Sequence, residues 1–238
     1  MLGRILGVGF ACGALCAASS ATVSFTFDDP GAGPEFLYTA GTDQLTQPGH
    51  LSFVGGTLDL IIDASEEGLG VHAFQAALVL EVEIGAVQSQ VGDLLISSII
   101  GGAFEFREIP QAGTEGIPGN VILAGSLSTG GVATFTTSGA VISTSTTGGL
   151  VLSEGPVLAP ILAGASLAPT FDVSFTLTNI RNLFGQPGAT LTPDGFISSF
   201  TANSAFTGNA ELATIPTPGA TVLLLCGACL ALVRRSRG

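Results

Sequence analysis

Hydrophobicity alternates with a period of two along most of residues 22–213, and this pattern leaves little freedom of fold. Five segments place apolar side chains at alternate positions, namely 23–27, 58–62, 78–84, 104–106 and 171–177. Polar or charged residues occupy most positions between them, as Glu81 and Glu83 do in the third segment. Successive side chains of a strand point to opposite faces of a sheet, so the pattern predicts half-buried β-strands.

Turn-forming residues separate these segments, among them Pro48-Gly49, Gly55-Gly56 and Gly101-Gly102. About ten short strands with such punctuation predict an all-β fold, an antiparallel β-sandwich or jelly roll forming one domain over residues 22–213. Residues 121–127 and 132–143 flank a Ser-Thr-Gly-Gly turn, which predicts a hairpin. Residues 155–170 hold three prolines and are expected to form either a long loop or an edge strand.

Charge is distributed unevenly along the chain of 238 residues. All 18 acidic residues lie between Asp28 and Glu211, where the only basic residues are Arg107 and Arg181, giving a formal charge of 2 − 18 = −16. Such a surface repels nucleic acid and anionic lipid, so we expect no nucleic-acid partner.

Residues 1–21 have the features of a secretory signal peptide. Arg4 precedes an apolar run, and Ser19-Ser20-Ala21 provides small residues for signal peptidase, so the mature chain is expected to begin at Thr22. The alternative is an N-terminal anchor that is not cleaved, for which the run is short. All four cysteines lie in the two terminal segments, which excludes a disulfide scaffold in the domain.

Residues 214–238 have the features of a second targeting signal, which we call, together with residues 1–21, the address segments. The motif Pro216-Thr217-Pro218 precedes an apolar run over residues 220–233, and Arg234, Arg235 and Arg237 follow it. A helix of this run covers about 21 Å, less than the ~30 Å of a hydrocarbon core, which fits a temporary anchor. The arginines are expected to stay in the cytoplasm, with the domain on the outer side.

This tail resembles the PEP-CTERM sorting signal, with Thr217 where the name-giving motif has Glu. The resemblance implies recognition by an exosortase, an integral membrane peptidase. It also implies a Gram-negative host with an exopolysaccharide matrix, and localisation at the cell surface or in that matrix after transient insertion in the inner membrane.

The expected domain offers little for catalysis. Its histidines are His50 and His72, and it has no Lys or Cys. General acid–base work relies most often on His or on paired carboxylates, so we expect a noncatalytic protein without a cofactor. The best candidate ligand set is the run from Asp63 to Gly68, where Asp63, Ser65 and Glu67 place oxygen atoms at alternate positions, as at the start of a calcium loop.

Carbohydrate binding would suit an exported protein, but aromatic platforms are scarce, since the chain has no Trp and a single Tyr, Tyr38. Residues 134–147 are dense in Ser and Thr, which fits a solvated strand face or a glycan-bearing segment. The favoured interpretation is a noncatalytic surface or extracellular-matrix protein associated with exopolysaccharide. The alternative is a carbohydrate- or calcium-binding module.

Overall fold

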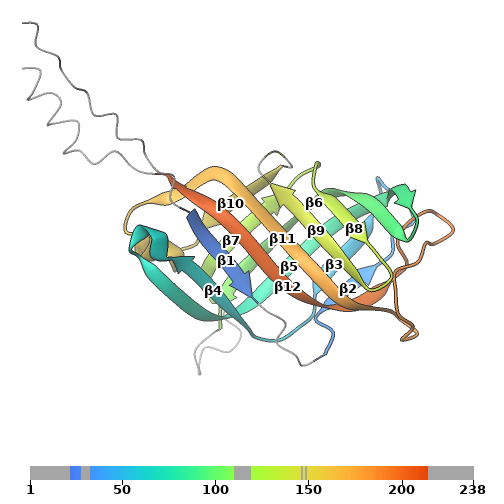
Figure 1. The fold of residues 1–238 in the computed structure, drawn as a ribbon, viewed down its shortest axis with the longest axis horizontal. Coiled ribbons are helices and arrows are strands. Elements are labelled where there is room, and N and C mark those ends of the chain that lie inside the picture. The colour runs from blue at the N-terminus through green and yellow to red at the C-terminus, as the bar shows by residue number, and fades with distance from the viewer. Residues whose placement is uncertain (1–21, 28–32, 110–118, 146, 148, 214–238) are drawn as a thin grey trace, which may run out of the picture.

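The computed structural model describes residues 22–27, 33–109, 119–145, 147 and 149–213. Twelve antiparallel strands form one hydrogen-bonded sheet, which confirms the all-β prediction (Figure 1). The strands are β1 (Thr22–Phe27), β2 (Phe36–Thr39), β3 (Gly49–Phe53), β4 (Leu58–Ala64), β5 (Gly70–Val91), β6 (Leu94–Glu108), β7 (Val121–Leu127), β8 (Val132–Phe135), β9 (Gly139–Ser145), β10 (Leu150–Glu154), β11 (Ser166–Asn182) and β12 (Phe200–Ala213). The expected signal peptide and the expected C-terminal helix lie outside the described residues.

Four long strands, β5, β6, β11 and β12, run the length of the domain, and shorter strands share their edges. Along one edge of β12, β1 pairs with residues 206–211 and β2 with residues 200–202. The hydrogen-bonded path from β12 through β2, β3, β5, β6, β8, β9 and β11 returns to β12, so the sheet closes on itself. Closure leaves few strand edges open to pair with another chain.

The predicted hairpin between residues 121–127 and 132–143 is wrong. β7 pairs with residues 102–107 of β6, and β8 pairs with residues 95–98 of the same strand, so β7 and β8 lie end to end along one edge of β6. β8 instead forms its hairpin with β9. The residues between β7 and β8 therefore do not form a hairpin turn. They connect two short strands that pair with different parts of β6, which is long enough for both.

The two layers of the sheet face each other across one apolar core, in the sandwich-like arrangement that the alternation predicted. Phe206 of β12 is fully buried and contacts Phe27, Phe104, Phe106 and Phe175, with ring centroids 4.9–5.8 Å apart. Phe104 and Phe106 belong to β6, in the layer behind β11 and β12 in Figure 1. Each buried Phe contributes about 1.5–3 kcal/mol, so this cluster joins the layers firmly.

Residues 155–170 form neither a simple loop nor a simple edge strand. They contain one helical turn, α1 (Leu158–Ile161), before β11 begins at Ser166. Leu158 and Leu162 are one turn apart and both are buried, so α1 closes one end of the core. Residues 70–77, which precede the predicted strand over residues 78–84, are part of β5 as well.

The first and last strands are neighbours. β1 lies between β4 and β12, and Thr22 is the register partner of Glu211. The described chain therefore starts and finishes at the same end of the domain, although Thr22 and Glu211 are 189 positions apart in the sequence.

Candidate functional site

Three shallow hollows lie on one face of the domain. The first is about 450 Å³ and is formed by β1, β11 and β12. The second, of about 290 Å³, lies over β8, β9 and β11. The third, of about 260 Å³, lies over β8, β9 and Asp172 of β11. Because Asp172 lines both the first and the third hollow, these two meet at its side chain.

Alternation explains which side chains form this face. In β12, Phe206, Gly208 and Ala210 are buried, whereas Thr207, Asn209 and Glu211 face outward. The same holds along β1, β8, β9 and β11, where the outward positions are mostly Ser and Thr. We define the hydroxyl face as the outward residues Thr22, Ser24, Thr26, Thr134, Ser143, Asp172, Ser174, Thr176, Thr178, Thr207, Asn209 and Glu211.

Strand register arranges these side chains in rows across the sheet. One row runs through Thr26, Thr207, Ser174 and Ser143, which are successive register partners on β1, β12, β11 and β9. Adjacent strands lie about 4.8 Å apart, so the row presents hydroxyl groups at a nearly constant interval. The result is a flat, regularly spaced array of groups that each donate and accept hydrogen bonds.

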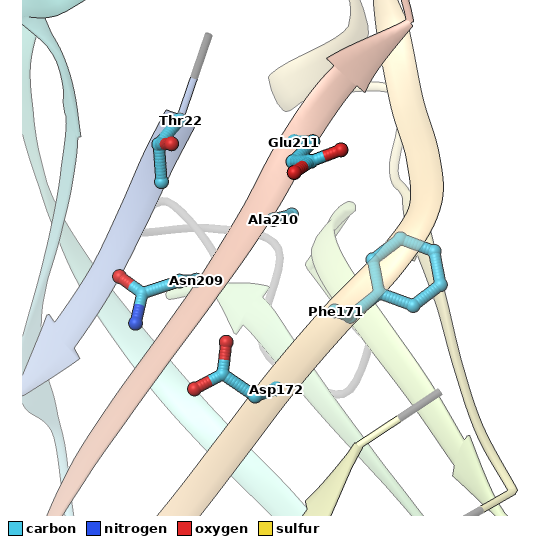
Figure 2. Close-up of a pocket in the computed structure, with 6 residues that line it drawn as sticks. All are labelled: Thr22, Phe171, Asp172, Asn209, Ala210 and Glu211. Atoms are coloured by element: carbon cyan, nitrogen blue, oxygen red, sulfur yellow. The ribbon is translucent and has the colours of Figure 1, made fainter. Parts of the chain in front are cut away.

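The next row contains the most polar part of the largest hollow. Asn209 is the register partner of both Ser24 and Asp172. Figure 2 shows the amide of Asn209 and the carboxylate of Asp172 on neighbouring strands, with Glu211 and Thr22 further along. Side chains directly opposite each other in an antiparallel pair have Cβ atoms about 5 Å apart, so one small polar ligand can reach both Asn209 and Asp172.

The charge of the hydroxyl face is small. Asp172 and Glu211 are its charged members, and Arg181 lies beyond Thr178, where its guanidinium donates to the carbonyl oxygen of Gly185 at 3.2 Å. Such a surface can exchange hydrogen bonds with a polyhydroxylated ligand, but it offers no cluster of cations to hold phosphate or sulfate groups.

The predicted calcium ligands lie elsewhere: Asp63 is near the end of β4, and Ser65 and Glu67 belong to the turn that follows it. Asp63 Oδ1 accepts hydrogen bonds from the backbone nitrogen of Ser65 at 2.9 Å and from its hydroxyl at 2.5 Å. These bonds, the hydroxyl first, hold the pKa of Asp63 below its usual value. Glu67 ends the 3₁₀ turn formed by Ser65–Glu67, and Gly68 follows with a φ of 71°. Asp63 therefore stabilises the turn itself, and calcium binding there stays a prediction.

The two histidines are well separated. His50 on β3 places Nε2 4.0 Å from a carboxylate oxygen of Glu81. The Nε2 atom of His72, near the start of β5, lies 2.9 Å from the carbonyl oxygen of Leu69. Over the described ranges, no three or more His, Cys, Asp and Glu side chains gather closely enough to hold a metal ion.

The sorting motif, Pro216, Thr217 and Pro218, and the basic residues Arg234, Arg235 and Arg237 lie outside the described residues. Among the residues that the structure does describe, no helix has both the length and the apolar content to cross a membrane.

The sequence analysis did not predict the hydroxyl face, although the sequence contains the residues that form it. Ser and Thr occupy the outward positions of residues 22–26 and 174–178, and residues 134–147 are dense in the same types. Only pairing joins these segments into one surface. Comparison of the chain with models of protein families, with curated proteins and with solved structures gave no match.

Proposed function

We propose that this protein is a noncatalytic surface or extracellular-matrix protein that is exported across the inner membrane of a Gram-negative bacterium. Signal peptidase removes residues 1–21, and residues 214–238 act as a PEP-CTERM-like tail that an exosortase recognises. The domain over residues 22–213 then acts outside the membrane, in association with exopolysaccharide. The proposal rests on the two address segments and on the pairing of β1 with β12.

That pairing is the structural observation that supports the proposal best. Because Thr22 is the register partner of Glu211, both address segments attach to the same end of the domain. Pro216 is three positions after Ala213, and an extended chain spans at most about 3.6 Å per residue. A tail held in the membrane would therefore keep this end of the domain within about 11 Å of its sorting motif.

The position of β1 also fits export as an unfolded chain. β1 lies between β4 and β12, so the sheet cannot close until the last strand is present. Contacts between segments so far apart in sequence form slowly, because loop-closure entropy opposes them. A chain that crosses the membrane from its N-terminus would complete this sheet only after β12 has emerged.

The charge of the domain supports the same environment. Arg107 donates from Nε to a carboxylate oxygen of Glu105 at 2.8 Å and from a terminal nitrogen to the carbonyl oxygen of Gly119 at 3.1 Å. One of the two arginines of the domain is thus bound internally, and the net negative surface favours solubility over binding to nucleic acid.

The test is intact mass and fractionation of the full chain in a Gram-negative host that makes exosortase. We expect a mature protein that begins at Thr22, lacks the Arg cluster and is found outside the cytoplasm. Replacing both Pro216 and Pro218 by Ala should leave the C-terminal tail on the protein. Pro187→Ala, which changes a proline in the loop between β11 and β12, is the matched control and should be processed normally. Cytoplasmic protein that keeps both ends would refute the proposal.

A further inference from the structure

We propose that the hydroxyl face binds chains of a neutral polysaccharide, with Asp172 and Asn209 at the centre of the binding surface. This deepens the proposed function, on which it rests for access to a matrix polymer. It assigns a ligand class and a set of residues to the domain.

The shape of the face supports an elongated ligand. The hollows over β1, β12 and β11 and over β8 and β9 meet at Asp172, and the remaining hollow lies further along β11, at Thr176 and Thr178. Asp172 and Thr178 are six residues apart on one strand, which corresponds to about 20 Å. The hollows are shallow, so they suit a chain lying along the surface, with room for several sugar rings.

The chemistry of the face matches sugar hydroxyl groups. A carboxylate accepts hydrogen bonds, whereas an amide or a hydroxyl both donates and accepts. Asp172 and Asn209 are direct register partners and both are exposed, so they can engage neighbouring hydroxyl groups of one sugar. The row of Thr26, Thr207 and Ser174 continues the array beside them.

The charge and the apolar content of the hydroxyl face favour some classes of ligand over others. Asp172 and Glu211 would repel uronate, sulfate and phosphate groups, which disfavours acidic polysaccharides, nucleic acids and anionic lipids. Protein interfaces generally have an apolar, aromatic-rich centre. The large exposed apolar side chains of β8 and β9 are Val132, which lines the third hollow with Asp172, and Val141, which lines the second. Two separate valines do not form an aromatic-rich centre, so a neutral glycan fits better than a protein.

The face lacks an aromatic platform, since Phe171, the aromatic residue beside the largest hollow, is only 7% exposed. Each row of hydrogen bonds is therefore expected to bind weakly, because water competes for the same groups. A polymer that occupies several rows at once gains avidity without new kinds of contact. Binding should consequently be much stronger for polysaccharides than for their monosaccharides.

Affinity gel electrophoresis of the full-length protein in mild detergent tests this inference. The gels contain dextran or galactomannan as neutral polymers, or alginate as an acidic polymer. We expect a neutral polymer to retard the protein and alginate not to do so. Asp172→Ala and Asn209→Ala should each raise the apparent dissociation constant about tenfold, because each removes hydrogen bonds from an exposed surface. Glu83→Ala, on the opposite layer, is the matched control and should not change it.

Two further measurements keep the result unambiguous. Asp172→Asn keeps most of the hydrogen-bonding capacity and should retain more binding than Asp172→Ala, and chelation by EDTA should have no effect. Absence of retardation by both neutral polymers would overturn the inference, as would equal retardation of wild type and both alanine variants, or loss of binding in EDTA. These outcomes concern the purified protein, so they are independent of the processing and fractionation that test the proposed function.

Discussion

The two outer surfaces of the domain differ although the same core supports both. The hydroxyl face carries Ser, Thr and Asn in rows, with Asp172 and Glu211 as its charged members. The opposite layer, formed by β4, β5 and β6, presents an acidic face, which we define as the outward residues Asp59, Glu81, Glu83 and Glu105. Most inward positions are apolar in both layers, with Ser97 of β6 and Ser204 of β12 as buried exceptions. The difference between the two faces therefore lies mainly in side chains that the fold does not need to bury.

The contrast shows that the outward residues of the two layers have different chemistry although their inward residues serve the same core. A cluster of carboxylates opposes association between molecules, because like charges on different molecules repel. Rows of hydroxyl groups add little repulsion, and their regular spacing is useful only to a ligand with repeated hydroxyl groups of its own. Under the polysaccharide-binding proposal made above, the acidic face is the solvent-facing side and the hydroxyl face is the ligand-facing side.

The largest expected effect concerns whether the layers that carry the two faces unfold together. Phe206 comes from the layer of the hydroxyl face and contacts Phe104 and Phe106 from the layer of the acidic face. Phe206→Ala should lower the free energy of unfolding by about 3–5 kcal/mol, measured by denaturant titration. Hydrogen exchange should then speed up in β5 and β6 as well as in β11 and β12. Loss of protection in one layer alone would show that the faces unfold independently.

A second prediction concerns a buried tyrosine in the core between the layers. Tyr38 of β2 is fully buried, stacks on Phe200 at 5.0 Å between ring centroids, and has no hydrogen-bond partner for its hydroxyl among the residues described. Burial raises the pKa of Tyr38 above its usual value. The neutral phenol is thus favoured in the folded state, so stability is present at neutral pH and is lost as pH rises above about 10, the usual tyrosine pKa.

Urea titrations at a series of alkaline pH values should show this loss at up to about 1.4 kcal/mol per pH unit. Tyr38→Phe should remove it and should raise stability at neutral pH by about 1 kcal/mol, because the buried hydroxyl has no partner. Residues 22–213 contain no other Tyr, no Lys and no Cys, which makes the alkaline range specific to this group in the domain. An unchanged alkaline loss in Tyr38→Phe would place its cause elsewhere in the sheet.

A smaller effect distinguishes the faces by their electrostatics. Glu81 and Glu83 lie two residues apart on the same side of β5 and are both exposed. Replacing either by Gln should raise stability by a few tenths of a kcal/mol at low ionic strength, and the gain should disappear in ~1 M salt because charges are screened there. Thr176→Val on the hydroxyl face is the control and should show no salt-dependent gain. Equal salt dependence in all three variants would contradict the proposed contrast.

The smallest effect concerns Asp63, beside the acidic face. Hydrogen bonds from Ser65 lower the pKa of Asp63, so they favour its charged form in the folded state. Their contribution to stability is present above the usual aspartate pKa and is lost as pH falls through the lowered value. Ser65→Ala should raise the pKa of Asp63 toward its usual value in an NMR titration, while Ser89→Ala on β5 should leave it unchanged. A constant pKa in Ser65→Ala would remove this explanation of the turn.

Much of the local structure followed from pattern alone, and some of it did not. The alternation over residues 78–84 and 171–177 predicted buried faces correctly, because the period of a strand depends only on its own backbone. The hairpin between residues 121–127 and 132–143 failed, because a turn signal reveals a change of direction but not which strand lies alongside. The helical turn α1 was missed because its three-proline context resembled a loop, and its buried Leu158 and Leu162 make sense only against the open end of the core.

The chain by itself determined which residues of each strand point inward, its acidic and lysine-free character, and the two address-like ends. Tertiary structure decided which outward residues became neighbours. Thr26, Thr207, Ser174 and Ser143 form one row only because β1, β12, β11 and β9 are adjacent in the closed sheet. The physical reason is that alternation is a local property of the backbone, whereas a binding surface depends on hydrogen-bonded register between residues that are up to 189 positions apart.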